Sequence, residues 1–138
     1  MKISSIMTKE VVTVDMDTSL KTICRIFDNK KFHHLFVVDN NELIGVISDR
    51  DLFKALSPFL KTPAEQNRDL ATLKKRAHQI MSRKPVTVKK GTSSKDAIRL
   101  ILRKNISCLP VISSDGQIEG IVTWRDLLIA YSQQLDVD

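Results

Sequence analysis

Hydrophobic and polar residues follow the same succession of periods twice along the chain. Each succession starts with a short stretch rich in β-branched residues, VVTV at 11–14 and PVTV at 85–88, which is typical of an extended strand. Apolar residues then recur at helical spacing, which predicts a helix with one buried face. The predicted buried faces are Leu20, Ile23, Cys24 and Phe27 in the first copy and Ala97, Ile98, Ile101 and Leu102 in the second. Thr18 and Thr92 precede these helices as predicted N-caps.

Two short apolar runs around a polar turn follow each predicted helix. The runs are HLFVVD and ELIGVIS, joined by Asn-Asn, and then CLPVIS and QIEGIVT, joined by Ser-Asp-Gly. Runs of this kind predict β-hairpins. A second helical segment, RDLFKAL or RDLLIAY, closes each copy, so the pattern predicts the order β-α-β-β-α twice.

The two copies are a tandem duplication. Residues 6–38 and 80–112 are identical at 12 of 33 positions, and residues 43–57 and 118–132 are identical at 6 of 15 positions. A unit of about 50 residues cannot cover its own apolar faces, so we expect the copies to pack against each other, sheet to sheet. The predicted boundaries are 1–57 for the first motif, 58–76 for a basic connector and 77–138 for the second motif. Thr62-Pro63-Ala64-Glu65 is typical of a helix start, so the connector is predicted to be partly helical.

Composition places the chain among ordinary globular proteins. Hydrophobic residues make up 42% and charged residues 28% of the sequence. The N-terminus lacks the apolar core of a signal peptide, and no apolar run approaches the roughly 18 residues of a membrane span. These features predict a cytoplasmic protein. Cys24 and Cys108 lie far apart among apolar neighbours and are interpreted as reduced core thiols.

The net charge of +6 is concentrated between the two copies. Residues 61–90 carry nine basic side chains against Glu65 and Asp69. A solvated face is the favoured interpretation of such a run, and attraction of an anionic partner is the alternative. A nucleic-acid partner is disfavoured, because the chain has no recognised nucleic-acid-binding motif and few aromatic side chains.

The sequence IM-x(4)-V-T-V, followed by a helix and by a hairpin that ends in G-h-h-[ST]-x-x-D, occurs twice. This arrangement resembles a tandem CBS (cystathionine-β-synthase-type) domain pair, or Bateman module, over residues 3–57 and 77–134. With no enzyme or transporter fused to it, the chain resembles the small stand-alone CBS-pair proteins of bacteria, including the acetoin-utilisation type. The resemblance implies an α/β (α+β) fold of two β-α-β-β-α motifs packed sheet to sheet with pseudo-two-fold symmetry. It also implies a homodimer without catalytic activity.

The resemblance further implies a regulatory ligand in the clefts between the two motifs, with a conformational change passed to a protein partner. The implied ligand is an adenine nucleotide (AMP, ADP or ATP) or an S-adenosyl compound, and no cofactor is required. Ribose would be bound by Asp51 and Asp126, and phosphate by Ser48, Arg50, Thr123, Arg125, His33 and His34. Adenine would be bound by Val12, Thr13, Ile47, Pro85, Val86 and Val122.

The chemistry of the [ST]-x-x-D boxes agrees with this implication. A carboxylate at a strand end can accept both hydroxyls of a ribose cis-diol, and the first N–H groups of a helix can bind phosphate. Arg50 and Arg125 can add charge-assisted bonds to phosphate oxygens. Helix capping explains the same residues, because Ser and Thr are good N-caps and Asp is favourable in a first turn. Ligand binding is the favoured interpretation, and a dimerisation module without a ligand remains the alternative.

The sequence gives little support to catalysis or to metal binding. The chain has four glycines, no Gly-rich phosphate loop and no G-x-S-x-G motif, so an enzyme is disfavoured. Adjacent histidines on a strand point to opposite faces, so His33 and His34 are a poor metal site. The second copy has Ser107-Cys108 in their place, and Pro110 and Pro85 where the first copy has Phe36 and Val11, which predicts two non-equivalent clefts. Trp124, in place of Asp49, is interpreted as a subunit contact, and stacking on a base is the alternative.

Overall fold

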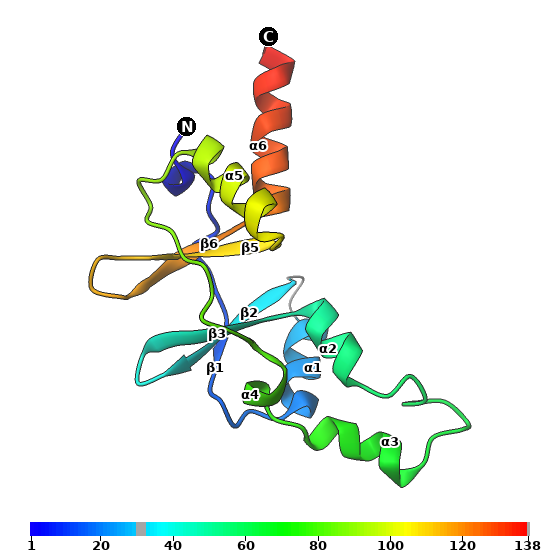
Figure 1. Ribbon diagram of the computed structural model, residues 1–138. Helices are drawn as coiled ribbons and strands as arrows, with labels where there is room; N and C mark the ends of the chain where they lie inside the picture. Colours follow the sequence, from blue (N-terminus) through cyan, green and yellow to red (C-terminus); the bar gives the residue numbers. More distant parts are fainter. Residues whose placement is uncertain (30–32, 138) are drawn as a thin grey trace. The chain divides into compact units, whose positions relative to one another are not determined.

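The computed structural model describes residues 1–29 and 33–137, which form two compact units (Figure 1). The first-repeat unit consists of Val12–Lys84. The second-repeat unit consists of Met1–Val11 together with Pro85–Asp138. Both are mixtures of helices and strands, so the fold is α+β as the sequence predicts. No helix in the described part of the chain is long and apolar enough to cross a membrane.

The first-repeat unit is built on a four-stranded sheet. Its elements, in chain order, are β1 (Thr13–Val14), α1 (Leu20–Asn29), β2 (His34–Asp39), β3 (Glu42–Ser48), α2 (Asp49–Ala55), α3 (Asn67–Ala71), a 3-10 helix (Thr72–Lys74), α4 (Ala77–Ile80) and β4 (Ser82–Arg83). The strand order is β1-β2-β3-β4, with β1 parallel to β2 and the other pairs antiparallel. Asn40 and Asn41 both adopt positive φ angles, the turn geometry that matches the twist of a two-residue hairpin.

The core of this unit lies between the sheet and its helices. Leu35 and Val37 alternate along β2 and pack with Ile23 of α1, Ile47 of β3 and Leu52 of α2. All five side chains are buried. The period-2 pattern of the strands and the helical stripe of α1 therefore meet at one interface, as the sequence predicts.

The second-repeat unit contains a 3-10 helix (Ile3–Ser5), α5 (Ser94–Lys104), β5 (Cys108–Ile112), β6 (Ile118–Thr123) and α6 (Trp124–Val137). Its V-T-V stretch forms a single parallel bridge, between Val88 and Val111, rather than a strand. In the first copy the Phe36 N–H donates to Val12 O at 3.0 Å. Pro110 occupies the matching position in the second copy and has no N–H to donate, so the parallel pairing is shorter there.

Each unit is completed by a segment that precedes the V-T-V stretch of the other repeat. Ser82 of β4 pairs with Val46 in the first-repeat unit, and Thr8 forms the matching bridge with Ile121 in the second-repeat unit. The Thr8 bridge has N···O distances of 2.8 and 2.9 Å in its two directions. The repeats have therefore exchanged equivalent segments, so the compact units do not coincide with the sequence repeats.

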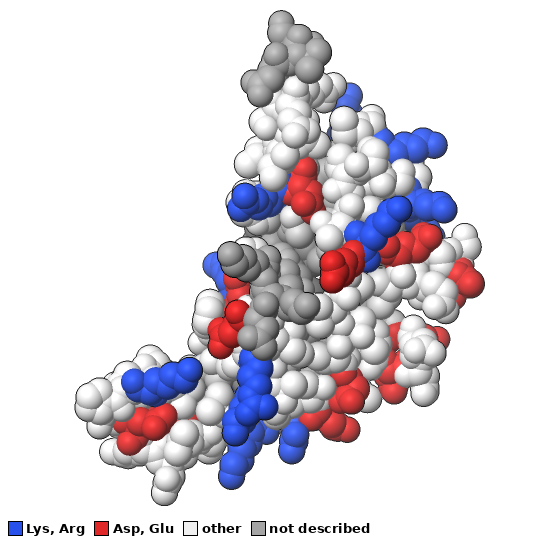
Figure 2. All heavy atoms as spheres, turned by 180° about the vertical axis from the view of Figure 1, so that it is seen from behind, with Lys and Arg blue, Asp and Glu red and all other residues white. Residues whose placement is uncertain are grey.

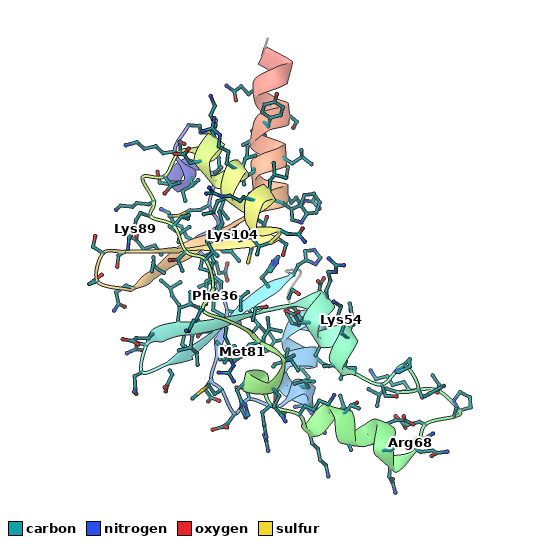
Figure 3. All side chains as sticks on the ribbon, in the orientation of Figure 1. Phe36, Lys54, Arg68, Met81, Lys89 and Lys104 are labelled. Atoms are coloured by element: carbon teal, nitrogen blue, oxygen red, sulfur yellow. The ribbon has the colours of Figure 1, made fainter. Side chains whose placement is uncertain are left out.

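The glycine that opens each G-h-h-[ST] sequence makes room for the exchanged segment. A Cβ atom on Gly45 would lie 2.5 Å from Sδ of Met81, which Figure 3 labels beside β3. A Cβ atom on Gly120 would lie 2.6 Å from the backbone oxygen of Thr8. Both distances are shorter than real Cβ contacts, so the repeated glycine has a packing role.

The helix starts differ from the expected ones by one residue. Ser93 Oγ accepts from Asp96 N at 3.1 Å, and Ser19 Oγ accepts from Thr22 N at 3.3 Å. Thr18 and Thr92 are therefore not the caps of α1 and α5.

Two further expectations need correction. Leu102 is 74% exposed instead of belonging to the buried face of α5, while Ala97, Ile98 and Ile101 pack into the core. The connector is partly helical as expected, but its helix α3 begins after the Thr62–Glu65 segment, which forms a turn.

Candidate functional site

Both [ST]-x-x-D boxes lie at a junction between a strand and a helix. Ser48 ends β3 and donates its backbone N–H to Asp51 Oδ2 at 2.9 Å, while Asp51 N donates to Ser48 Oγ at 3.1 Å. Thr123 and Asp126 repeat this exchange between β6 and α6, at 2.9 and 3.2 Å. Each box is therefore a reciprocal capping box, and the capping interpretation is confirmed.

Capping leaves part of each box available to a ligand. Only Oδ2 of Asp51 and of Asp126 is used by the cap, and neither Oδ1 atom is hydrogen-bonded within the described residues. The Ser48 and Thr123 hydroxyls act as acceptors in the caps and keep their own protons for donation. Capping and ligand binding are therefore compatible at both helix N-termini.

The side chains predicted to bind phosphate differ in whether they already form contacts within the protein. Arg50 and Arg125 are exposed, and neither forms an ion pair or hydrogen bond with any described residue. His33 is exposed, and its Nδ1 lies 2.7 Å from Asp49 Oδ2. His34 begins β2, where it is half-buried and lies opposite Ser48 in the strand ladder.

The His33–Asp49 contact was not anticipated from the sequence. The Asp49 N–H also donates to His33 O at 2.9 Å, so two hydrogen bonds join the start of β2 to the start of α2. In the second copy Trp124 stands in place of Asp49, so the pair cannot form there. This difference between the copies was the sequence signal for a specific contact of Asp49. The two boxes therefore have different surroundings.

The predicted adenine-binding residues divide between the units. Val12 and Thr13 lie at β1 beside the first box, and Pro85 and Val86 are half-buried in the second-repeat unit. The Ile47 and Val122 side chains have no exposed surface and belong to the two hydrophobic cores. A base would touch these two side chains only if they became uncovered.

Four of the nine basic side chains in residues 61–90 are engaged with backbone carbonyls. They are Lys75 with Ala55 O (3.0 Å), Arg76 with Asp17 O (3.0 Å), Arg83 with His78 O (3.2 Å) and Lys89 with Ser113 O (2.8 Å). On the face shown in Figure 2, basic and acidic side chains are interspersed. Part of the charge run therefore forms hydrogen bonds within the protein. This weakens the hypothesis that residues 61–90 bind an anionic partner.

Within residues 1–29 and 33–137, no cluster of three His, Cys, Asp or Glu side chains is placed to hold a metal ion. Cys24 and Cys108 are not joined by a disulfide, and the first is half-buried and the second buried.

Comparison with known proteins identifies the domain type. The family model for the CBS domain matches twice, over residues 3–58 and 77–133. A CBS domain-containing protein of Dictyostelium discoideum is 35% identical over 128 residues, which cover 91% of this chain and 88% of that protein. Two longer relatives from Methanocaldococcus jannaschii are spanned by the chain over 48% and 38% of their length.

Two solved structures are similar over nearly their whole length. The CBS domain pair of protein MJ0100, in complex with 5′-methylthioadenosine and S-adenosyl-L-methionine, has a TM-score of 0.80 and 24% identity, covering 97% of this chain and 98% of that one. CBSX2 in complex with AMP has a TM-score of 0.76 and 30% identity, covering 96% of both chains.

Proposed function

The chain belongs to the CBS domain family, with two CBS domains, and from this premise we propose that it binds an adenine nucleotide or an S-adenosyl compound as a regulatory ligand. The domain pair is regulatory rather than catalytic. The observation that carries the proposal is that both [ST]-x-x-D boxes are formed and still hold an unused carboxylate oxygen and hydroxyl proton. Related pairs are solved with adenosyl ligands or AMP.

The boxes offer groups suited to a ribose 5′-phosphate. Oδ1 of Asp51 or Asp126 accepts hydrogen bonds from the ribose hydroxyls, while the adjacent hydroxyl donates to the phosphate. The N-terminus of the following helix adds its partial positive charge, and Arg50 or Arg125 is free to pair with phosphate oxygens. The backbone at Val12–Thr13 or Pro85–Val86 would hold the adenine.

The two sites are proposed to differ in affinity. His33 stands beside the first box and can shift between Asp49 and a phosphate group, since its ring is exposed. The second box has Trp124, 53% exposed, in place of this pair. Occupancy of one site before the other follows from these different surroundings.

The proposal includes a homodimer in the cytoplasm that passes the ligand state to a protein partner. Trp124, Leu128 and Tyr131 are exposed on α6 at spacings of four and three residues, which places them on one helix face. An exposed apolar stripe of this kind is typical of a protein contact. A ligand shifts the equilibrium between two states only by its difference in affinity for them.

The test is calorimetric titration and thermal shift of the purified chain with AMP, ADP, ATP, S-adenosylmethionine, NAD and GMP. A ligand at 100 times its Kd adds about 2.7 kcal/mol to the free energy of unfolding, a shift of several degrees in Tm. We expect the shift with an adenine ligand, not with GMP, and a loss of binding in Asp51→Ala or Asp126→Ala.

The control variant is Asp96→Ala. Ser93 and Asp96 form another S-x-x-D sequence, at the start of α5 and away from the predicted ligand residues, and Ser93 caps Asp96 N. This variant keeps the Ser93 cap but loses the first-turn charge of Asp96 and its 3.5 Å contact with Arg99, so it should lose some helix stability without losing ligand affinity. Unchanged binding in both Asp51→Ala and Asp126→Ala would rule out the boxes as the ligand site.

A second candidate function is a dimerisation module that has no ligand. The exposed stripe on α6 is the observation that favours it. An absence of any ligand-induced shift, together with a stable dimer in light scattering, would support this second function.

A further inference from the structure

The first-repeat unit holds a cavity next to the [ST]-x-x-D box. It has a volume of about 1090 Å³ and lies between α1, α2 and the connector residues that follow α2. Small-molecule sites typically measure about 300–1,000 Å³, so the cavity has the size of a ligand pocket. Ser48, Arg50 and Asp51 are not among its lining residues, while Asp49 and His33 are.

The walls of this cavity are predominantly apolar. Leu52 and Leu56 come from α2, Cys24 comes from α1, and Leu60 and Leu73 come from the connector. Burial raises the pKa of the Cys24 thiol, and the negative charge of Asp28 adds to the shift. The thiol is therefore protonated at neutral pH and contributes to an uncharged wall.

Four cations from three elements surround this apolar space. They are Lys21 and Arg25 of α1, Lys54 of α2 and Lys61 of the connector. None of the four forms an ion pair with a carboxylate among the described residues. Figure 3 shows Lys54 on α2, on the side of the unit where the connector leaves the helix.

The acidic groups of the lining are largely committed elsewhere. Asp49 Oδ2 is bound by His33 Nδ1 at 2.7 Å. Glu65 Oε1 accepts a hydrogen bond from the Lys61 N–H at 3.1 Å, which turns this carboxylate toward its own loop. Asp28 of α1 is the third carboxylate of the lining, and no described hydrogen bond or ion pair engages it. The four cations outnumber this one carboxylate, so the cavity favours an anionic ligand.

The outer wall is held in place by a buried carboxylate. Asp69 is 5% exposed and accepts hydrogen bonds from Ser57 Oγ at 2.7 Å and from Gln66 N at 2.8 Å. Thr72 Oγ1 accepts from Ser57 N at 3.2 Å. These bonds fix both ends of the loop at 57–66 to the connector helices, so the cavity is formed before any ligand arrives.

Within the described residues, the second repeat offers no equivalent wall. There α6 continues to Val137, whereas α2 ends at Ala55 and is followed by the connector. The cavity is thus a property of the first repeat and its connector, and does not follow from the duplicated CBS motif.

We propose that this cavity is a second ligand site, which takes a small amphiphilic anion with an aliphatic or aromatic body and one anionic group. The apolar walls take the body of the ligand, and the four cations at the rim take its charge. The cavity ligand binds without Asp51 or Asp126, and His33 borders both this site and the first box.

The first experiment is a fluorescence titration of the full chain with 8-anilinonaphthalene-1-sulfonate, followed by displacement with decanoate. We expect saturable binding and displacement by decanoate. Lys21→Glu and Lys54→Glu should each weaken binding by about five- to tenfold, as expected for a lost charge-assisted contact. Lys95→Glu is the matched control, because Lys95 occupies the position of Lys21 in the second repeat, and it should leave binding unchanged. Equal effects of Lys21→Glu and Lys95→Glu would overturn the proposal.

The second experiment locates the ligand through Cys24. The modification of Cys24 by a thiol reagent is followed by peptide mass spectrometry, with buried Cys108 as the internal reference. Decanoate should slow the reaction of Cys24 several-fold, in wild-type protein and equally in Asp51→Ala, which separates this site from the adenine site. Unchanged reactivity contradicts the proposal. Protection that grows with protein concentration instead of decanoate would assign the cavity to a second copy of the chain.

Discussion

The two repeats share a framework and differ on their outer helices. In both, a hairpin leads into a capping box, and a glycine in the hairpin accepts an exchanged segment. In the first repeat the connector encloses a cavity with α1 and α2, whereas in the second repeat α6 continues to Val137. The difference shows that the duplicated residues specify the framework and the boxes, while the segments that follow the two boxes differ.

The largest expected effect is at the repeated glycine. Gly120→Ala should lower the free energy of unfolding by about 2–3 kcal/mol, because the new Cβ meets the Thr8 backbone oxygen, which moves only with its strand. Gly45→Ala should cost about 1 kcal/mol, because the Met81 side chain can change rotamer. Urea denaturation measures both values.

The control for the glycine pair is Gly91→Ala. Nothing lies within 4 Å of a Cβ atom placed there, so stability should stay within about 0.5 kcal/mol of the wild type. A larger cost at Gly45 than at Gly120 would contradict the different natures of the two contacts.

The next effect concerns the exposed face of α6. In the proposed homodimer, Leu128→Glu should weaken self-association at least about tenfold, or about 1.4 kcal/mol, because it places a charge in the proposed apolar contact. Light scattering across a dilution series measures the change, and Trp124 fluorescence reports it independently. Gln133→Glu, an exposed change elsewhere on α6, is the matched control. Equal dimer stability in both variants would remove α6 from the interface.

A smaller effect is the expected loss of connector stability at acidic pH. The hydrogen bond from Ser57, and then the one from Gln66 N, hold the pKa of Asp69 below its usual value of 3.8. The ionised carboxylate therefore stabilises the folded connector at pH values above its usual pKa. This stabilisation is lost as the pH falls through the lowered pKa that Asp69 has in the folded protein. Pepsin cleavage within residues 57–66 should increase over this range.

The Asp69→Asn variant tests the assignment of that acid response. Its connector should be cleaved at a rate that no longer depends on this titration. A wild-type connector that resists pepsin equally at pH 4.5 and at pH 2.5 would show that Asp69 does not control it.

The smallest expected effect is at the end of α2. Lys75 Nζ donates to Ala55 O at 3.0 Å and so caps the C-terminal end of this helix. Lys75→Met should lower stability by about 0.5 kcal/mol, and the loss should shrink in high salt. Lys74→Met is the neighbouring control, and a loss of the same size there would assign the effect to net charge alone.

Local patterns in the sequence predicted the hairpins and the boxes. Asn40-Asn41 specifies its turn through two residues that tolerate positive φ, and Ser48 with Asp51 specifies a strand-to-helix junction. The cap at Ser93 rather than Thr92 was not predictable in this way. Thr92 O accepts from Ile3 N at 2.9 Å, so the geometry before α5 depends on a segment far away in the sequence.

The exchanged segments and the cavity could not be predicted from the sequence either. Thr8 and Ser82 are held through backbone hydrogen bonds, which leave no side-chain signature. The cavity forms because the connector folds back against α2. The buried hydrogen bonds of Asp69 with Ser57 and Gln66 determine the position of that fold. The candidate ligand residues rest on the family resemblance, because a capping box looks the same in the sequence with or without a ligand.

The exchange of segments has a consequence for the newly made chain on the ribosome. Thr8 leaves the ribosome well before its partner Ile121, which is made about 110 residues later. The segment around Thr8 must therefore wait for this partner, while the first-repeat unit can already close around Ser82. Two fragments cut in the connector would each lack a pairing segment that the other carries. They should fold together when mixed and fail to fold apart.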